Sequence, residues 1–151
     1  YYTGSKNGKV TFSQVGNFNN PQYPELEDFG DCTLLFDSGA TGYCRLDWFT
    51  PEGLNTWGDG RLFILGTKGY IEVRKYIDVA MSMTENTLFL VNETKQEKIN
   101  ATGATGFPYF GQLILDCLEN TDLALPQEHV FETSRLAIAA EKEAKIIKGF
   151  A

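Results

Sequence analysis

The stretch that decides the fold covers residues 58–75 and reads GDGRLFILGTKGYIEVRK. Two strand-like runs, 61–65 and 69–76, begin within it and are joined by Gly66-Thr67-Lys68. β-Branched and aromatic residues between glycines are typical of strands, and so short a connection sets two strands side by side in antiparallel order. We therefore expect a β-hairpin here.

This hairpin belongs to a longer series of strand-like patterns in the first two thirds of the chain. Runs separated by turn residues predict further strands at 9–15, 29–37, 41–49, 86–91 and 95–99. The period then changes to helical spacing, which predicts helices over 107–120 and 127–148. Strands in one block and helices in the next indicate an α+β fold, a mainly antiparallel open sheet with helices packed on one face.

Alternation of side chains gives the predicted sheet two unlike faces. One face is aliphatic and should lie under the helices; it carries Cys44, Leu46, Trp48, Ile71 and Val73. The other face mixes aromatic with charged side chains, a composition enriched in protein interfaces, and we expect it to build a homo-oligomer. The expected interface residues are Tyr43, Phe49, Tyr70, Glu72, Arg74 and Tyr76. A solvated face and a substrate-facing surface stay open as alternatives.

Length and charge narrow the class of protein. The 151 residues fit one domain, 1–151, and the hydrophobic fraction of 42% excludes wholesale disorder. A net charge of −7 repels phosphate, so neither nucleic acid nor an anionic membrane is an expected partner. No apolar stretch is long enough to span a bilayer, and the first residues do not form a signal peptide. Three cysteines without a C-x-x-C motif indicate reduced thiols and a cytoplasmic compartment.

Few residues suggest catalysis. The single histidine, His129, has Ser134 five positions away on another helical face, so we assign it no catalytic role. One histidine without a thiol pair also argues against a metal site. The glycines around Asp59 and those at 103–106 complete neither a G-x-G-x-x-G motif nor a P-loop, so no dinucleotide site is expected in this chain.

The loop over 50–61 is the richest in recognition groups, because Trp57, Asp59 and Arg61 fall within five residues. An aromatic ring beside an acid and a base suits stacking on, and hydrogen bonding to, a sugar-like ligand. The same residues also suit a tight turn locked by an Asp59–Arg61 pair. A separate acidic cluster is interpreted as a solvated loop or strand edge. It comprises Glu25, Glu27, Asp28 and Asp31.

Several weak motifs occur in an informative order. Phe29-Gly30-Asp31 and the run 42–51 come first, then the run 58–75, then a short helix, a Pro-containing linker and an Ala-rich helix. In this order they resemble the Gfo/Idh/MocA oxidoreductases, which include glucose–fructose oxidoreductase and inositol dehydrogenase. The run 58–75 is similar to the family's G.l.i.Gt.G.ie.rk hairpin, and the resemblance covers nearly the whole chain.

The resemblance implies one domain of a larger enzyme. Family members have an N-terminal Rossmann domain that binds NAD or NADP. Their C-terminal domain shapes the substrate site, commonly builds the oligomer, and has a fold like the second domain of glyceraldehyde-3-phosphate dehydrogenase. Residues 1–151 resemble that C-terminal domain only, with the Rossmann domain, the lysine motif and the catalytic helix lying upstream. We therefore expect no catalytic residue, no bound cofactor and no activity in this chain alone.

The expected parent protein is an NAD(P)-dependent oxidoreductase that acts on a sugar, an inositol or a related polyol. The residues expected nearest to its substrate are Arg45, Asp47, Trp57, Asp59 and Arg61. Two alternatives stay open. One is a non-enzymatic module that dimerises through its sheet, and the other is a glycan-binding domain that uses Trp48 or Trp57 for stacking.

Overall fold

The computed structural model describes residues 1–78 and 85–148 and arranges the chain in two compact units. The first unit combines Tyr1–Phe49 with Pro108–Ala151, and the second is the continuous segment Thr50–Phe107. Both consist mainly of antiparallel strands, so the predicted α+β class is confirmed. No helix within residues 1–78 and 85–148 has the length and apolar character that crossing a membrane requires.

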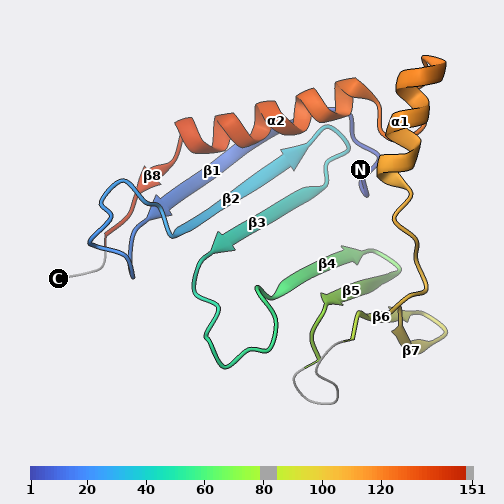
Figure 1. Cartoon of the computed structure of the whole chain (residues 1–151), viewed down its shortest axis with the longest axis horizontal. Helices are drawn as coiled ribbons and strands as arrows, with labels where there is room; N and C mark the ends of the chain where they lie inside the picture. The colour runs from blue at the N-terminus through green and yellow to red at the C-terminus, as the bar shows by residue number, and fades with distance from the viewer. Residues whose placement is uncertain (79–84, 149–151) are drawn as a thin grey trace. The chain divides into compact units, whose positions relative to one another are not determined.

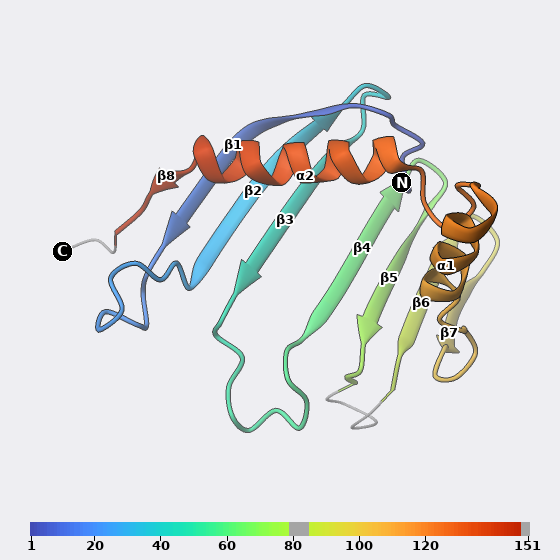
Figure 2. The same cartoon turned by 45° about the horizontal axis from the view of Figure 1, so that its top comes forward.

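The first unit is a four-stranded sheet with two helices (Figures 1 and 2). Its strand order is β3-β2-β1-β8, and all pairings are antiparallel except the parallel one between β1 and β8. The strands are β1 (Gly8–Gly16), β2 (Phe29–Phe36), β3 (Thr41–Asp47) and β8 (Lys145–Ile146). The helices are α1 (Tyr109–Glu119) and α2 (Gln127–Lys142).

Helix α2 lies along β1 and decides which side of this sheet is covered (Figure 1). A methyl group built on Gly8 would stand 3.3 Å from Leu136 of the helix and 3.0 Å from the ring of Phe36. Gly8 is the cross-strand partner of Phe36, so both point toward α2. By alternation, the same side of the sheet, here called the helix face, also carries Leu34, Cys32, Cys44 and Leu46.

Two charged residues of α2 hold the start of β1. Glu132 accepts the backbone N–H of Gly8 at 3.0 Å, and Arg135 donates to the Gly8 carbonyl at 2.7 Å. The two side chains also pair with each other at 2.6 Å. The hydrogen bond from Arg135, together with that from the Gly8 N–H, lowers the pKa of Glu132 to about 2.

The cover over the helix face ends before β3. Leu46 is 77% exposed and Cys44 is exposed as well, although both lie on the predicted aliphatic side. A helix is roughly 10 Å across, whereas strands are spaced about 4.8 Å apart, so one helix covers about two strands. The sequence pattern gave the correct side, but the cover from α2 does not reach the third strand.

A fully buried carboxylate organises the loop between β1 and β2. Asp28 accepts hydrogen bonds from the backbone N–H of Phe18 at 2.9 Å, from that of Asn19 at 2.7 Å and from the side chain of Asn20 at 2.9 Å. Burial opposes the charge, but these donors outweigh it and lower the pKa of Asp28. The prediction of a solvated acidic cluster is therefore wrong for this residue.

The second unit is a four-stranded antiparallel sheet of order β4-β5-β6-β7 (Figure 2). Its strands are β4 (Gly60–Gly66), β5 (Gly69–Lys75), β6 (Thr87–Asn92) and β7 (Gln96–Asn100). The hairpin expected from residues 58–75 is thus present as β4 and β5. Gly69 has a φ of +151°, and a side chain there would collide with the Val91 carbonyl oxygen of β6, so this strand start requires glycine.

The main boundary error concerns the last helix. It was expected to run to residue 148, but α2 ends at Lys142, and the chain then forms β8. The backbone N–H of Ile147 donates to the Val15 carbonyl at 2.8 Å, so strand pairing with β1 replaces helical hydrogen bonds there. Two smaller differences affect expected interface residues, since Phe49 lies beyond the end of β3 and Tyr76 lies beyond the end of β5 with a left-handed φ of 69°.

Candidate functional site

The open face of the first sheet, opposite the helix face, carries a connected polar network. Asp31 of β2 lies opposite Arg45 of β3, and one oxygen of its carboxylate accepts two hydrogen bonds. The donors are the side-chain amide of Gln14 at 3.1 Å and the hydroxyl of Tyr43 at 3.1 Å. Partial burial raises the pKa of the Tyr43 phenol, and its hydrogen bond to the charged Asp31 raises it further. Tyr43 therefore stays a neutral donor at physiological pH.

Arg45 and Asp47 extend this network along β3. Arg45 donates from Nε to the Asp47 carboxylate at 2.8 Å, and its guanidinium lies 4.9 Å from the centre of the Phe29 ring. The hydrogen bond to Asp47 raises the pKa of Arg45 despite partial burial. The second oxygen of Asp47 accepts the backbone N–H of Phe49 at 3.2 Å, which fixes the exit of the chain from β3. The guanidinium is thus held in one orientation by an ion pair and an aromatic ring.

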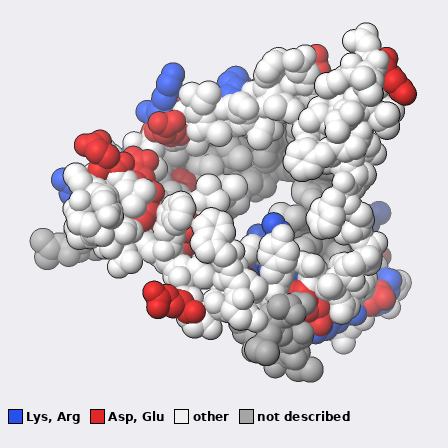
Figure 3. Space-filling model, viewed as in Figure 1, with Lys and Arg blue, Asp and Glu red and all other residues white. Residues whose placement is uncertain are grey.

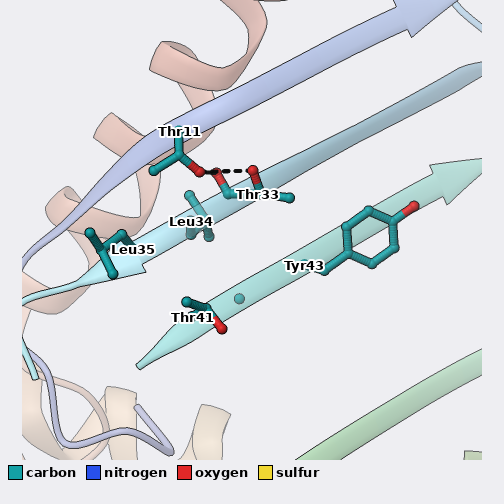
Figure 4. Close-up of a pocket in the computed structure, with 7 residues that line it drawn as sticks. Thr11, Thr33, Leu34, Leu35, Thr41 and Tyr43 are labelled. Carbon is teal, nitrogen blue, oxygen red and sulfur yellow. Dashed lines mark hydrogen bonds between the residues drawn. The ribbon is translucent and has the colours of Figure 1, made fainter. Parts of the chain in front are cut away.

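A hollow of about 610 Å³ lies beside this network, over β1, β2 and β3 (Figure 4). The hydroxyls of Thr11 and Thr33 meet at 2.8 Å on its floor, and Tyr43 stands at the side given by β3. Its lining combines hydroxyl groups with aliphatic carbon, which suits a small polyhydroxylated ligand. The lining residues are Thr11, Thr33, Leu34, Leu35, Thr41, Gly42 and Tyr43.

The second unit presents its own charged network on one side of its sheet. Arg61 donates two hydrogen bonds to the Asp59 carboxylate, from Nε at 3.1 Å and from Nη2 at 2.7 Å. This hydrogen bonding lowers the pKa of Asp59 and raises that of Arg61. Arg74 lies directly across from Arg61, and Glu72 pairs with Arg74 at 2.7 Å. Two guanidinium groups can stand side by side on β4 and β5 because each has its own carboxylate.

Aromatic rings flank these ion pairs. Phe63 and Tyr70 stack with ring centres 5.4 Å apart, and Arg74 lies 5.5 Å from the centre of the Phe89 ring. The side of the second sheet that carries them therefore combines aromatic surface with alternating charge, as the sequence predicted for Tyr70, Glu72 and Arg74. Figure 3 shows Lys and Arg side chains close to Asp and Glu side chains in this part of the chain.

The predicted substrate residues fall on both units. Arg45 is brought together with Asp47 in the first unit, and Asp59 with Arg61 in the second. Trp57 lies in the loop before β4 and is 89% exposed. Four polar residues on the open face of the first sheet had not been singled out as site residues: Thr11, Gln14, Asp31 and Thr33. Their grouping depends on which residues face one another across three strands, a register that the sequence does not give directly.

The two glycine pairs do not form the turn of a dinucleotide-binding motif. Gly58 and Gly60 lead into the antiparallel strand β4, and Gly103 and Gly106 follow β7, so neither pair links a parallel strand to the start of a helix. His129 makes an edge contact with the ring of Tyr1, with centres 6.2 Å apart. Within residues 1–78 and 85–148, no three His, Cys, Asp or Glu side chains are grouped as a metal site would require.

Comparison with solved structures places this architecture among known enzymes. A candidate oxidoreductase from Erwinia carotovora atroseptica SCRI1043 is 47% identical, with a TM-score of 0.93, and the match covers 98% of this chain and 44% of that chain. An aldose-aldose oxidoreductase from Caulobacter crescentus is 18% identical, with a TM-score of 0.59 over 92% of this chain and 40% of that chain. KijD10, a 3-ketoreductase from Actinomadura kijaniata solved with NADP, is 11% identical, with a TM-score of 0.56 over 94% of this chain and 42% of that chain.

These structural neighbours are oxidoreductases of the Gfo/Idh/MocA type. The resemblance predicted from the sequence is thereby confirmed, and the chain has the α+β fold of oxidoreductase C-terminal domains. It spans less than half the length of each Gfo/Idh/MocA neighbour reported above. No protein-family model and no curated protein matches the sequence.

Proposed function

We propose that this chain is the C-terminal domain of an NAD- or NADP-dependent oxidoreductase that acts on a sugar, an inositol or a related polyol. The observation that carries the proposal is the 47% identity to a candidate oxidoreductase over 98% of the chain. Support for the cofactor and the substrate class comes from the fold neighbours, one solved with NADP and one acting on aldoses. The nicotinamide would be held by a Rossmann domain of the parent protein and would exchange a hydride with the substrate carbinol.

The contribution of this chain would be to bind and orient the substrate. A polyol presents hydroxyls that both donate and accept hydrogen bonds, and the paired residues Arg45–Asp47 and Asp59–Arg61 offer both kinds of group at partly exposed positions. Trp57 offers an exposed aromatic ring for the apolar side of a sugar. Hydride transfer needs reacting atoms held about 3–3.5 Å apart, so such positioning contributes directly to the rate.

Substitution in the full-length parent protein tests this role. Alanine at Arg45, Asp47, Trp57, Asp59 and Arg61, singly and together, should raise KM for the polyol, by about tenfold or more where two hydrogen bonds are lost. The matched control is Lys95→Ala, which breaks the exposed Lys95–Glu97 pair at 2.7 Å outside the expected site. Unchanged KM and unchanged subunit assembly in the fivefold variant would contradict the proposal. Hydride transfer by the isolated chain would contradict its assignment as a domain without redox chemistry.

We further propose that a second copy of the chain binds to aromatic and charged surface on each unit. The residues are Tyr43 and Phe49 in the first unit and Tyr70, Glu72, Arg74 and Tyr76 in the second. The alternation of Glu72 with Arg74 makes such a surface self-complementary, as a twofold interface requires. Sedimentation should reveal a concentration-dependent dimer that is weakened by Arg74→Glu, whereas Lys95→Glu should leave it unchanged. A monomer at high concentration would contradict this arrangement. Loss of the dimer with KM unaffected would favour a purely interacting module over a substrate-binding one.

A further inference from the structure

Two cysteines that lie twelve positions apart in the sequence face each other in the first sheet. Cys32 of β2 and Cys44 of β3 are direct cross-strand partners, and both point to the helix face. Ser13 of β1 is the next residue in the same row, opposite Cys32. The serine is buried, and its hydroxyl has no hydrogen-bond partner among the described residues. Two thiols and the Ser13 hydroxyl group therefore lie next to one another across β1, β2 and β3.

The strand pairing brings the two backbones within the range of a disulfide. The N–H of Trp48 donates to the Asp28 carbonyl at 3.0 Å, which marks 28 and 48 as a hydrogen-bonded pair. Every second pair is of the same type, so Cys32 and Cys44 also form a hydrogen-bonded pair, with Cα atoms about 5.5 Å apart. Disulfides typically join Cα atoms that are roughly 4.4–6.8 Å apart. No change of register is needed to join them.

The same geometry makes the bond a strained one. Opposed Cβ atoms are about 4.5–5.5 Å apart, toward the upper value in a hydrogen-bonded pair, whereas a disulfide needs roughly 3.5–4.5 Å, so β3 must move by about 1 Å or more toward β2. β3 is the edge strand of its sheet, which makes such a movement possible. A strained, accessible disulfide is easily reduced again, which is typical of labile or regulatory bonds.

The neighbours of the pair leave room for the sulfur atoms. On the helix face the adjoining cross-strand pairs are Leu34 with Gly42 and Gly30 with Leu46, so each contributes one side chain instead of two. Cys44 is exposed and Cys32 is half-buried, so an oxidant in solution reaches Cys44 first. Burial raises the pKa of the Cys32 thiol, and the nearby Cys44 and Asp31 raise it further, in agreement with their closeness.

We propose that Cys32 and Cys44 form a reversible cross-strand disulfide when the chain meets a disulfide oxidant such as oxidised glutathione. The Cys44 thiolate attacks one glutathione sulfur, the glutathione disulfide breaks, and one glutathione thiolate leaves. The Cys32 thiolate then attacks the Cys44 sulfur and displaces the second glutathione. The two protons lost by the cysteines end on the two glutathione thiolates, so one protein disulfide forms for each glutathione disulfide reduced. The third cysteine, Cys117 on α1, takes no part.

The position of the bond connects it to the open face. Cys44 lies between Tyr43 and Arg45, whose side chains point to the opposite side of β3, so drawing Cys44 toward β2 shifts both. An effect of oxidation on substrate binding or dimer formation therefore rests on the proposed function. Formation of the bond does not, because it depends only on the sheet of the first unit.

Oxidation of the 151-residue chain tests the inference. After incubation with oxidised glutathione, free thiols should fall from three per chain to one, and the tryptic peptide 10–45, which contains both cysteines, should lose two hydrogens in mass. Reduced glutathione should restore all three thiols. Cys117→Ser should leave this response intact, whereas Cys44→Ser should abolish it.

Three outcomes would overturn the proposal. In the first, a stable glutathione adduct remains on Cys44 without ring closure. In the second, covalent dimers form that require Cys117. In the third, all three thiols survive in a chain whose amide signals show β2 and β3 folded. None of these measurements uses enzymatic activity. The disulfide proposal and the proposed oxidoreductase function can therefore be confirmed or contradicted independently of each other.

Discussion

The residue Asp28 offers the sharpest test at the scale of a single side chain. Its two oxygens accept three hydrogen bonds, from Phe18, Asn19 and Asn20, in a fully buried position. Asp28→Asn replaces one oxygen by an NH₂ group that faces N–H donors, so at least one buried donor is left without a partner. We expect Tm of the chain to fall by several degrees, measured by circular dichroism. The exposed neighbour Glu27 supplies the control, since Glu27→Gln should change stability by no more than about 0.5 kcal/mol. Equal Tm values for the two variants would contradict the role given to Asp28.

Single residues also mark the limit of what the sequence could predict about the candidate site. Arg45 with Asp47, and Asp59 with Arg61, are two positions apart in or beside a strand, so alternation alone puts each pair on one face. Asp31 was assigned to a solvated cluster, because its partner Gln14 comes from another strand, seventeen positions away. The β1–β2 register contains an irregularity between Val10 and Phe12, which shifts all later pairings. No local pattern contains that information.

Gly69, at the start of β5, is a position in the second unit where the backbone requires glycine. A side chain on Gly69 would collide with the Val91 carbonyl oxygen of β6, and its φ of +151° disfavours other residues in any case. Gly69→Ala should therefore destabilise the chain by about 2–4 kcal/mol, measured by urea unfolding. Gly111→Ala is the matched control, because no atom lies within 4 Å of the new methyl group and alanine favours the helix α1. A loss at Gly111 as large as that at Gly69 would show that the strand contact is not the cause.

At the scale of elements, the contact between α2 and β1 predicts a pH dependence. The pKa of Glu132 is lowered from 4.5 to about 2 in the folded chain, first by Arg135 and then by the Gly8 N–H. A lowered folded pKa means that the carboxylate stabilises the fold fully above pH 4.5 and that this share is lost as pH falls toward about 2. Glu132→Gln removes the charge and keeps an acceptor for Gly8. The free energy of unfolding should therefore fall less steeply with acid in this variant than in the wild type.

The control for this titration is Glu141→Gln, on the same helix and exposed. It should leave the acid dependence of the free energy of unfolding unchanged, because the hydrogen bonds between α2 and Gly8 of β1 do not involve Glu141. If wild type and Glu132→Gln lose stability in parallel between pH 4.5 and about 2, the contact with Gly8 contributes nothing measurable.

The elements themselves were predictable where their signals are local. The β4–β5 hairpin follows from glycines and β-branched residues next to each other in sequence, and the structure has it within one residue of the expected bounds. The end of α2 was not predictable in this way. Residues 143–148 continue a helical pattern, but Ile146 and Ile147 pair with the end of β1, more than a hundred positions away. Tertiary hydrogen bonding outweighs a weak local preference there.

At the scale of the whole molecule, the described residues bury little apolar surface. Phe29 and Ile77 are the buried hydrophobic residues in this part of the chain. The hydrophobic fraction of 42% excluded wholesale disorder, but composition counts apolar residues without stating what covers them. The exposed apolar residues on α1, Phe110, Ile114 and Leu118, illustrate the difference.

The sheet of the second unit should depend on the rest of the chain for its stability. Its four strands form one sheet whose aliphatic side, with Leu62, Ile64, Ile71, Val73, Leu88 and Leu90, is at best half-buried, and the described part of Thr50–Phe107 contains no helix to cover it. A stable domain needs two packed layers, because a single sheet leaves one apolar side in water. The isolated peptide 50–107 should therefore show no cooperative unfolding in urea, whereas the 151-residue chain should. If the rest of the 151-residue chain covers that aliphatic side, Leu62→Ala and Ile71→Ala should each lower the free energy of unfolding of the whole chain by more than about 1 kcal/mol. If nothing covers it, the loss should be smaller. A sharp, reversible unfolding transition in the isolated peptide would show that this single sheet is stable alone. A second layer that covers its aliphatic side would then not be required.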